Sequence, residues 1–242
     1  MDSAHPKPES LNEAVAASSL NPVTPENRAK IEGLTEDQVL AQLEQPDLAP
    51  EDLEKVGKQN ALLKSRKVSL AIVRHCRTPR HVSLAIVRRL LTFDLMRVAL
   101  EPVVPGDIKI AAEEALIRRL ETVTSGEKLA LARRASGRVA AALLSDPEER
   151  VMRLALDNAR LTESLLLHAL SGDASSRLVQ AVCQHSKWSL REDVRMALLR
   201  NQHTAMEQAL DLGRHVSVSR LEEILQHSGL PEATKAILLK RD

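Results

Sequence analysis

The sequence predicts an all-α protein, folded as a right-handed α-solenoid of short helical repeats. Three observations lead to this prediction. The heptamer Val-Ser-Leu-Ala-Ile-Val-Arg occurs at 68–74 and again at 82–88, with a Thr-Pro turn between the copies. The chain also matches itself when it is shifted by 126 residues. Finally, Leu, Ala, Arg, Lys and Glu dominate while Phe and Trp occur once each and Tyr is absent, a composition that favours helices.

Residues 1–29 are expected to form a disordered or loosely ordered tail. Four prolines occur among Ser, Asn, Glu and Ala in this stretch. Their spacing leaves no segment with the apolar periodicity of a helix. The tail is read as a solvated terminus, with a tether or a short binding motif as the alternatives. A single helical-repeat domain is expected over 30–242.

From residue 34 onward the sequence predicts helices of about 8–15 residues joined by short turns. No stretch alternates apolar and polar residues as a strand does. Helix starts are expected where Ser or Thr is followed three residues later by Glu or Gln, the capping box. Six such pairs occur: Thr35/Gln38, Thr124/Glu127, Ser145/Glu148, Ser189/Glu192, Thr204/Glu207 and Ser219/Glu222.

The internal match decides the predicted fold. The shift of 126 residues places Val68 on Val194 and Thr78 on Thr204. It predicts two copies of one segment, at about 34–113 and 161–239, with intervening repeats at 114–160. Within each copy, turn signatures recur about every 26 residues, the length of one helix pair. So small a unit cannot bury its apolar face alone, so neighbouring units must stack.

The turns carry a recurring motif, His75-Cys-Arg-Thr-Pro79, Asn158-Ala-Arg-Leu-Thr162 and Asn201-Gln-His-Thr-Ala205. It resembles the Asn-x-x-Thr-Pro-like turn of bacterial leucine-rich-repeat-variant proteins, and the unit resembles HEAT-like helical repeats. Residues 34–242 are also similar to a bacterial group of uncharacterised helical-repeat proteins. The resemblance implies a fold and no activity. The iron–sulfur cluster of one repeat-variant member needs closely spaced N-terminal cysteines, which this chain lacks, so no cofactor is expected.

The sequence gives no sign of export or of a membrane segment. Its two cysteines, Cys76 and Cys183, are too few for a disulfide framework. The first twenty residues have neither a basic start nor an apolar core. The longest apolar run, Val139–Leu144, is far shorter than the ~20 residues that cross a bilayer. We therefore expect a cytoplasmic protein.

A basic run is the first candidate binding feature. No acidic residue occurs between Glu54 and Asp94. Such a run predicts a positive face that attracts phosphates or an acidic protein. The alternative is a solvated ridge whose arginines cover apolar neighbours. The second copy interrupts the run with acidic residues, so the face would belong to the N-terminal half. The candidate residues are Lys64, Arg66, Lys67, Arg74, Arg77, Arg80, Arg88 and Arg89.

Trp188 is the second candidate partner-binding feature. A lone Trp is a common interface anchor. It is also a large core residue that can fill the space between repeats. The core interpretation is favoured because the residue 126 positions earlier is Leu62.

Catalytic, metal and cofactor sites are not predicted. His75, Cys76 and His81 have no spacing suited to metal ligands on one helix, and they are read as a buried thiol and turn histidines. Ser125-Gly-Glu-Lys128 lacks the glycine-rich span and preceding strand of a phosphate loop. No Ser/His/Asp or Cys/His arrangement stands out.

The sequence therefore predicts a non-enzymatic protein-binding or scaffold module that presents an extended helical surface to a protein or peptide. The alternative is a nucleic-acid-associated protein that binds phosphates through the basic helices 58–89. Nucleic acid is the less favoured partner because one Trp and one Phe cannot build a stacking surface. Steep salt dependence would distinguish phosphate binding from a protein interface.

Overall fold

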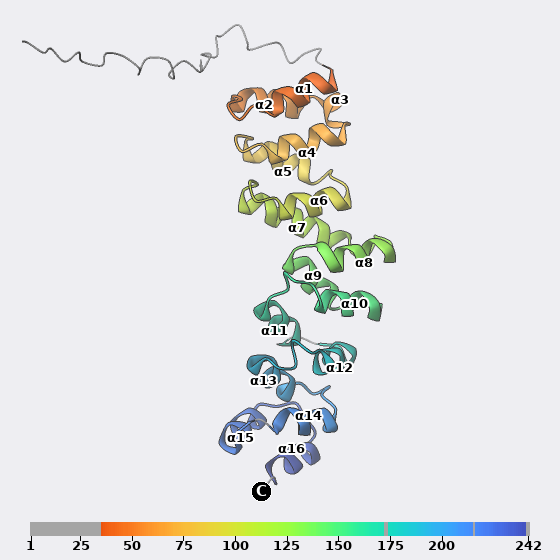
Figure 1. Cartoon of the computed structure of the whole chain (residues 1–242), viewed down its shortest axis with the longest axis vertical. Coiled ribbons are helices and arrows are strands. Elements are labelled where there is room, and N and C mark those ends of the chain that lie inside the picture. Colours follow the sequence, from red (N-terminus) through yellow and green to blue (C-terminus); the bar gives the residue numbers. More distant parts are fainter. Residues whose placement is uncertain (1–34, 172–173, 215, 241–242) are drawn as a thin grey trace, which may run out of the picture. The chain divides into compact units, whose positions relative to one another are not determined.

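The structure is a computed structural model that describes residues 35–171, 174–214 and 216–240. Over these residues the chain is all-helical, with 16 helices and no strand (Figure 1). Residues from 35 onward form one compact unit. The expected tail, 1–29, and the first residues of the expected domain lie outside the described residues.

The helices are short, from four residues in α3 to 14 in α7. None of those in the described ranges combines the length and the apolar character needed to span a membrane. Their bounds are α1 (Glu36–Leu43), α2 (Pro50–Lys58), α3 (Asn60–Leu63), α4 (Arg66–Arg74), α5 (Arg80–Val87), α6 (Thr92–Leu100), α7 (Gly106–Arg119), α8 (Ser125–Arg134), α9 (Gly137–Leu143), α10 (Glu149–Leu156), α11 (Glu163–Ser171), α12 (Ser176–Gln184), α13 (Glu192–Arg200), α14 (Met206–Gly213), α15 (Val218–Gln226) and α16 (Glu232–Leu239).

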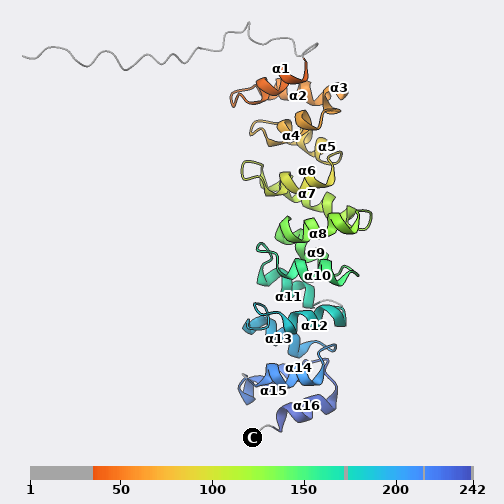
Figure 2. The ribbon, with the colours of Figure 1, turned by 45° about the vertical axis from the view of Figure 1, so that its right-hand side comes forward.

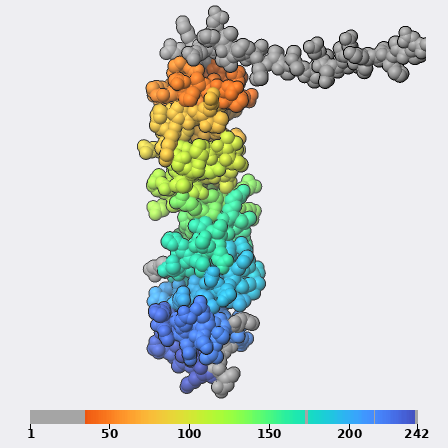
Figure 3. Space-filling view, turned by 90° about the vertical axis from the view of Figure 1, so that its left-hand side faces the viewer, coloured from red at the N-terminus to blue at the C-terminus, as the bar shows by residue number. Residues whose placement is uncertain are grey.

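Apart from the four-residue α3, which contacts α2 and α4, the helices of this unit alternate between two rows. The second row consists of α2, α5, α7, α9, α11, α13 and α15, and each contacts the next. The first row consists of α1, α4, α6, α8, α10, α12, α14 and α16. Its contacts are sparser between α6 and α8 and between α12 and α14. Figures 1 and 2 show the helices following one another in chain order, and the space-filling view shows the same order as colour bands (Figure 3).

The core lies between the rows. In α4 the side chains of Val68, Ile72 and Val73 are buried, which is one stripe of a 3.6-residue period. In α10 the same stripe holds Val151 and Leu156. Helix α3 buries no residue and every other helix only two to five, so the apolar core is continuous only because neighbouring helices stack.

Helix bounds follow the 126-residue shift. Helices α4, α5 and α6 fall, with identical lengths, on α13, α14 and α15. The shift advances the chain by nine helices, an odd number, so α4 lies in the first row and α13 in the second. The smallest repeating element is therefore one helix with its turn. The spacing of about 26 residues is the distance between helices of one row, as from Arg66 to Thr92.

Two of the six expected capping boxes are present, at Thr35 and Thr124. The other four were wrong. The N-cap residues of α10, α13, α14 and α15 are Glu148, Arg191, Ala205 and Ser217, none with a side-chain cap hydrogen bond. Thr204 fails as a cap because its hydroxyl is turned inward, where it donates to the carbonyl of Leu198.

Candidate functional site

The turns use one hydrogen-bond pattern to tie each helix to its predecessor in the row. In the turn after α4, His75 Nδ1 accepts the backbone N–H of Arg77 at 3.2 Å, and Nε2 lies 2.9 Å from the carbonyl oxygen of Gln45, which follows α1. The ring therefore donates through Nε2. A helix end leaves carbonyl groups without partners, and this contact satisfies one of them.

Other turns repeat the pattern with a different side chain. Asn158 accepts the N–H of Arg160 at 2.8 Å and donates to the carbonyl of Ala132 at 2.7 Å. Ser228 accepts the N–H of Leu230 and donates to the carbonyl of Leu199. These side chains, like His75, hold the repeats together, and the turn motif is structural.

Trp188 lies in the core. Its side chain is 1% exposed, and its indole N–H donates to the carbonyl of Leu156 at 2.8 Å. The Lys187 ammonium lies 3.8 Å from the ring centroid. This geometry agrees with the favoured core interpretation, and it removes Trp188 from the surface that a partner can reach.

The basic run is not free of acidic partners in space. Arg66 donates to the two carboxylate oxygens of Asp94 at 2.6 and 2.7 Å. Arg74 lies 2.8 Å from Glu101, and Arg80 lies 2.6 Å from Asp107.

Each of these carboxylates lies 27 or 28 residues further along the chain, at the next helix of the same row. Hydrogen bonding to Asp94 raises the pKa of Arg66. The expectation of one uninterrupted positive face is corrected accordingly, because stacking brings carboxylates against three of its arginines.

The remaining candidate cations of the run fall into two groups. Arg77 donates to the carbonyl of Asp47 and Arg89 to the side chain of Asn60. Lys64, Lys67 and Arg88 make no ion pair within the described residues. The cations of the basic run therefore have different surroundings and do not form one positive face.

The outer faces of α1, α4 and α6 form two neighbouring hollows. The α1/α4 hollow has a volume of about 490 Å³, with Leu40, Ala71 and Val103 in its walls. The α4/α6 hollow has a volume of about 360 Å³, with Leu70, Met96 and Leu100 in its walls. Arg74 and Glu101 line both hollows, so their ion pair lies between them. We call the two hollows together the first-row groove.

Two residues of the basic run, Lys67 and Arg74, therefore face one surface. Sequence reasoning missed the apolar residues and Arg97, which share that surface. It also expected Cys76 to be buried, whereas the thiol is exposed and lines the α1/α4 hollow. Burial raises the pKa of Cys183 to about 11.

The two copies differ on the α6 side of the groove, whereas Leu70 and Ala71 of α4 correspond to the apolar Met196 and Ala197. Under the 126-residue shift, buried Leu95 and Val98 of α6 correspond to buried Leu221 and Ile224 of α15. The outward residues of α6 and of the turn after it do not keep their character. They change as Met96 to Glu222, Arg97 to Glu223, Leu100 to Gln226 and Val103 to Gly229.

The comparison of α6 with α15 shows which residues such a helix needs in order to form. A helix of the same length and the same buried stripe forms in α15 with polar, acidic outward residues. The apolar lining of the first-row groove is therefore not needed to build the helix. Comparing outward positions between the copies is the signal by which sequence reasoning could have found Met96 and Leu100.

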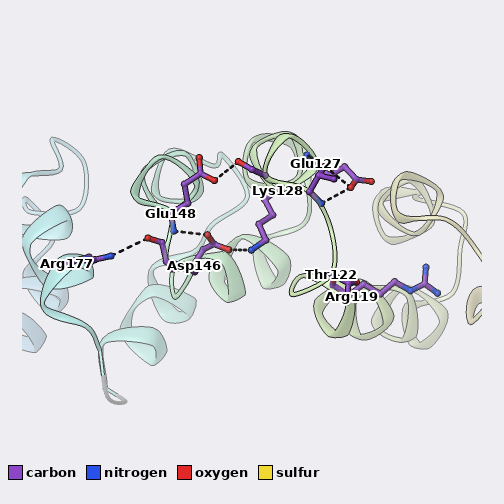
Figure 4. A network of polar contacts seen from close by, with 10 residues as sticks. Arg119, Thr122, Glu127, Lys128, Asp146, Glu148 and Arg177 are labelled. Carbon is purple, nitrogen blue, oxygen red and sulfur yellow. Dashed lines mark hydrogen bonds and ion pairs between the residues drawn. The ribbon is translucent and has the colours of Figure 1, made fainter.

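A polar network joins the middle repeats (Figure 4). Lys128 of α8 contacts Asp146 at 2.7 Å, and both side chains are largely buried. Asp146 also accepts the N–H of Glu148, whose carboxylate accepts from Ser125. Arg177 donates to the carbonyl of Pro147. The Ser125–Lys128 segment is thus a helix start, and the charge of Lys128 is already compensated.

Within the described residues, no three His, Cys, Asp or Glu side chains are grouped so that they could hold a metal ion. Comparison with protein-family models, with curated proteins and with solved structures finds no significant match to this chain. Function must therefore be inferred from the surface that the helices themselves present.

Proposed function

We propose that this chain is a non-enzymatic protein-binding module of the cytoplasm, a right-handed α-solenoid of HEAT-like repeats whose first-row groove receives a segment of a partner protein. The observation that carries the proposal is the apolar lining of that groove, which on the α6 side includes Met96 and Leu100, whose counterparts in α15 are the polar Glu222 and Gln226.

The physical support is the cost of leaving such a surface in water. Burial of apolar surface contributes about 25 cal/mol per Å². An apolar floor with a few charged groups at its rim is the composition of a recognition site. Val103 is 61% exposed at the rim of the groove, so a partner side chain can reach it.

The alternative, binding of nucleic acid through its phosphates, draws on the candidate cations that make no ion pair within the described residues: Lys64, Lys67, Arg77, Arg88 and Arg89. It is the weaker candidate, because Arg66, Arg74 and Arg80 already contact carboxylates. The test is the salt dependence of oligonucleotide binding. An affinity that falls steeply between 50 and 200 mM salt, by about 10³-fold or more, would favour this alternative.

The proposed groove is tested by selecting displayed random peptides on the full chain. Ala71→Arg places a long side chain in the α1/α4 hollow. Ala85→Arg makes the same change on an exposed face of α5, outside the groove. We expect selected peptides to bind the wild type and the Ala85→Arg variant but not the Ala71→Arg variant, with all three equally helical. Peptides that bind the Ala71→Arg variant undiminished, or no enriched peptides, would contradict the proposal.

A further inference from the structure

The first-row groove carries positive charge that the described residues do not compensate. Lys67 in the α1/α4 hollow and Arg97 in the α4/α6 hollow make no ion pair within those residues. The ammonium of Lys109, also without an ion pair there, lies 3.3 Å from the carbonyl oxygen of Pro102, which lines the α4/α6 hollow. Against these three cations stands one carboxylate in the same condition, that of Glu44 in the α1/α4 hollow.

The other charged side chains at the groove are paired. Arg74 lies 2.8 Å from Glu101, and both line the two hollows. The three cations without ion pairs outnumber the one carboxylate, so the groove as a whole is positive. A carboxylate that a partner brings to its rim is attracted, whereas a partner lysine or arginine is repelled.

Folding does not account for the charge at two of these positions. Under the 126-residue shift, Lys67 corresponds to Asp193 and Arg97 to Glu223, so both positions are acidic in the second copy. The helices that carry them have the same lengths in the two copies. Because such a helix forms with either charge, the cations are not needed to build it.

The third cation differs between the copies in its partner. Lys109 corresponds to Lys235, whose ammonium lies 2.9 Å from the carboxylate of Glu232. The position of Glu232 is occupied in the first copy by Gly106. At all three positions, therefore, the first copy has more uncompensated positive charge than the second.

The distribution of the cations favours carboxylates over phosphates. Lys67 lines only the α1/α4 hollow and Arg97 only the α4/α6 hollow, so they do not surround one common position. Recognition of a phosphorylated side chain uses a cluster of cations. The walls contributed by Leu70, Met96 and Leu100 suit apolar side chains, which the sugar–phosphate chain of a nucleic acid does not offer.

From these observations we infer that the partner segment is acidic. It places apolar side chains in the two hollows and separate carboxylates beside Lys67 and Arg97, with Lys109 adding to the attraction. This inference rests on the proposed function and specifies its ligand.

The test begins with the peptides selected on the full chain, which should carry more Asp and Glu than Lys and Arg. One selected synthetic peptide is then titrated into the wild type and into two double variants. The groove variant, Lys67→Asp with Arg97→Glu, installs the residues of the second copy. The control variant, Arg150→Asp with Arg133→Glu, makes the same change of charge outside the groove. Its exposed arginines also occupy the second residue of one helix and the last turn of another.

We expect the groove variant to bind the selected peptide about tenfold to a hundredfold more weakly, since each reversal replaces an attraction by a repulsion. The control variant should keep the affinity of the wild type at about 0.15 M salt, where charges more than about 8 Å apart are largely screened. A peptide whose carboxylates are exchanged for lysines should bind the groove variant more tightly than the wild type.

Equal losses of affinity in the two double variants, or selected peptides without an acidic excess, overturn the inference. So does an oligonucleotide that competes with the peptide and loses affinity only in the groove variant. Self-association of the wild type that the groove variant lacks also overturns it, because a second copy would then occupy the groove.

The proposed function is tested separately by Ala71→Arg. If this change abolishes binding of selected peptides that have no acidic excess, the groove remains the binding site and only the inferred ligand is wrong. Peptides that bind the Ala71→Arg variant undiminished overturn both the inference and the proposed function.

Discussion

His75 and Asn201, 126 residues apart, make the same two hydrogen bonds. Each accepts the backbone N–H of the residue two positions on, and each contacts a carbonyl at or just after the end of the preceding helix in its own row. The correspondence extends to Thr78 and Thr204, whose hydroxyls donate to the carbonyls six residues earlier, both at 2.6 Å. One turn geometry therefore serves both rows, with imidazole and carboxamide interchangeable in it.

Thr204→Val tests the role of the buried hydroxyl. The substitution keeps the shape of the side chain but removes the hydrogen bond to the Leu198 carbonyl, so we expect a loss of about 1 kcal/mol in the free energy of unfolding. Thr204→Ser, which retains the hydroxyl, should cost less. Urea denaturation followed by circular dichroism measures both. A valine variant as stable as the wild type would show that the inward hydroxyl contributes nothing.

Gly137→Ala tests the close approach of two turns. A Cβ at Gly137 would collide with the carbonyl oxygen of Arg160, a backbone atom that cannot rotate away. We expect a loss of about 1–3 kcal/mol in stability. Gly126→Ala is the matched control, since nothing lies within 4 Å of its Cβ position and alanine favours the helix by up to about 1 kcal/mol. Equal midpoints for the two variants would contradict the packing described here.

Trp188→Leu tests whether the single tryptophan is a core residue. Its side chain is buried and hydrogen-bonded, so we expect a stability loss of about 2–4 kcal/mol with unchanged affinity for a groove-binding peptide. The intrinsic fluorescence of the wild type should also shift to longer wavelength on unfolding. If a folded Trp188→Leu protein lost affinity for the peptide, Trp188 would be part of the binding surface and the core interpretation would be wrong.

The two cysteines should differ in reactivity. The thiolate is the reactive form, and burial raises the pKa of Cys183 to about 11, whereas Cys76 is exposed. At pH 8 an alkylating reagent should modify Cys76 rapidly and Cys183 only after unfolding. Mass spectrometry of the native and the urea-unfolded chain distinguishes the two sites.

The same pKa shift has a defined sign for stability. The folded chain keeps Cys183 protonated while the unfolded chain, with a thiol pKa near 9.0, releases the proton first. The protonated thiol of Cys183 therefore contributes its full share to the free energy of unfolding below pH 9. That share is lost as the pH rises toward 11. In the Cys183→Ala variant, the free energy of unfolding should therefore fall less between pH 9 and pH 11 than in the wild type, whatever the variant's stability at neutral pH.

The helical fold could be predicted because buried positions repeat. Leu95 and Leu221, or Val98 and Ile224, keep their apolar character under the shift, and such a periodic stripe is the strongest local signal for a helix. Helix starts were less predictable. A Ser or Thr before an acidic residue scores as a capping box whether its hydroxyl points outward, as in Thr124, or inward, as in Thr204.

The candidate surface could be predicted only in part. A run of cations is visible in the sequence, but the carboxylates that compensate it stand on the next helix of the row. Asp94, Glu101 and Asp107 lie 27 or 28 residues from their arginines. Stacking therefore compensates part of the positive charge that the sequence shows. It also brings together Leu70, Met96 and Val103 from separate segments, so the groove is visible only in the three-dimensional structure.

The central claim is that the first-row groove binds a partner segment through side chains that the fold does not need. The most direct measurement is calorimetric titration of a selected peptide into the wild type and into a chain carrying Met96→Glu with Leu100→Gln, the residues of α15. We predict that the double variant unfolds within about 0.5 kcal/mol of the wild type and no longer binds the peptide. Undiminished binding by the folded double variant would contradict the claim.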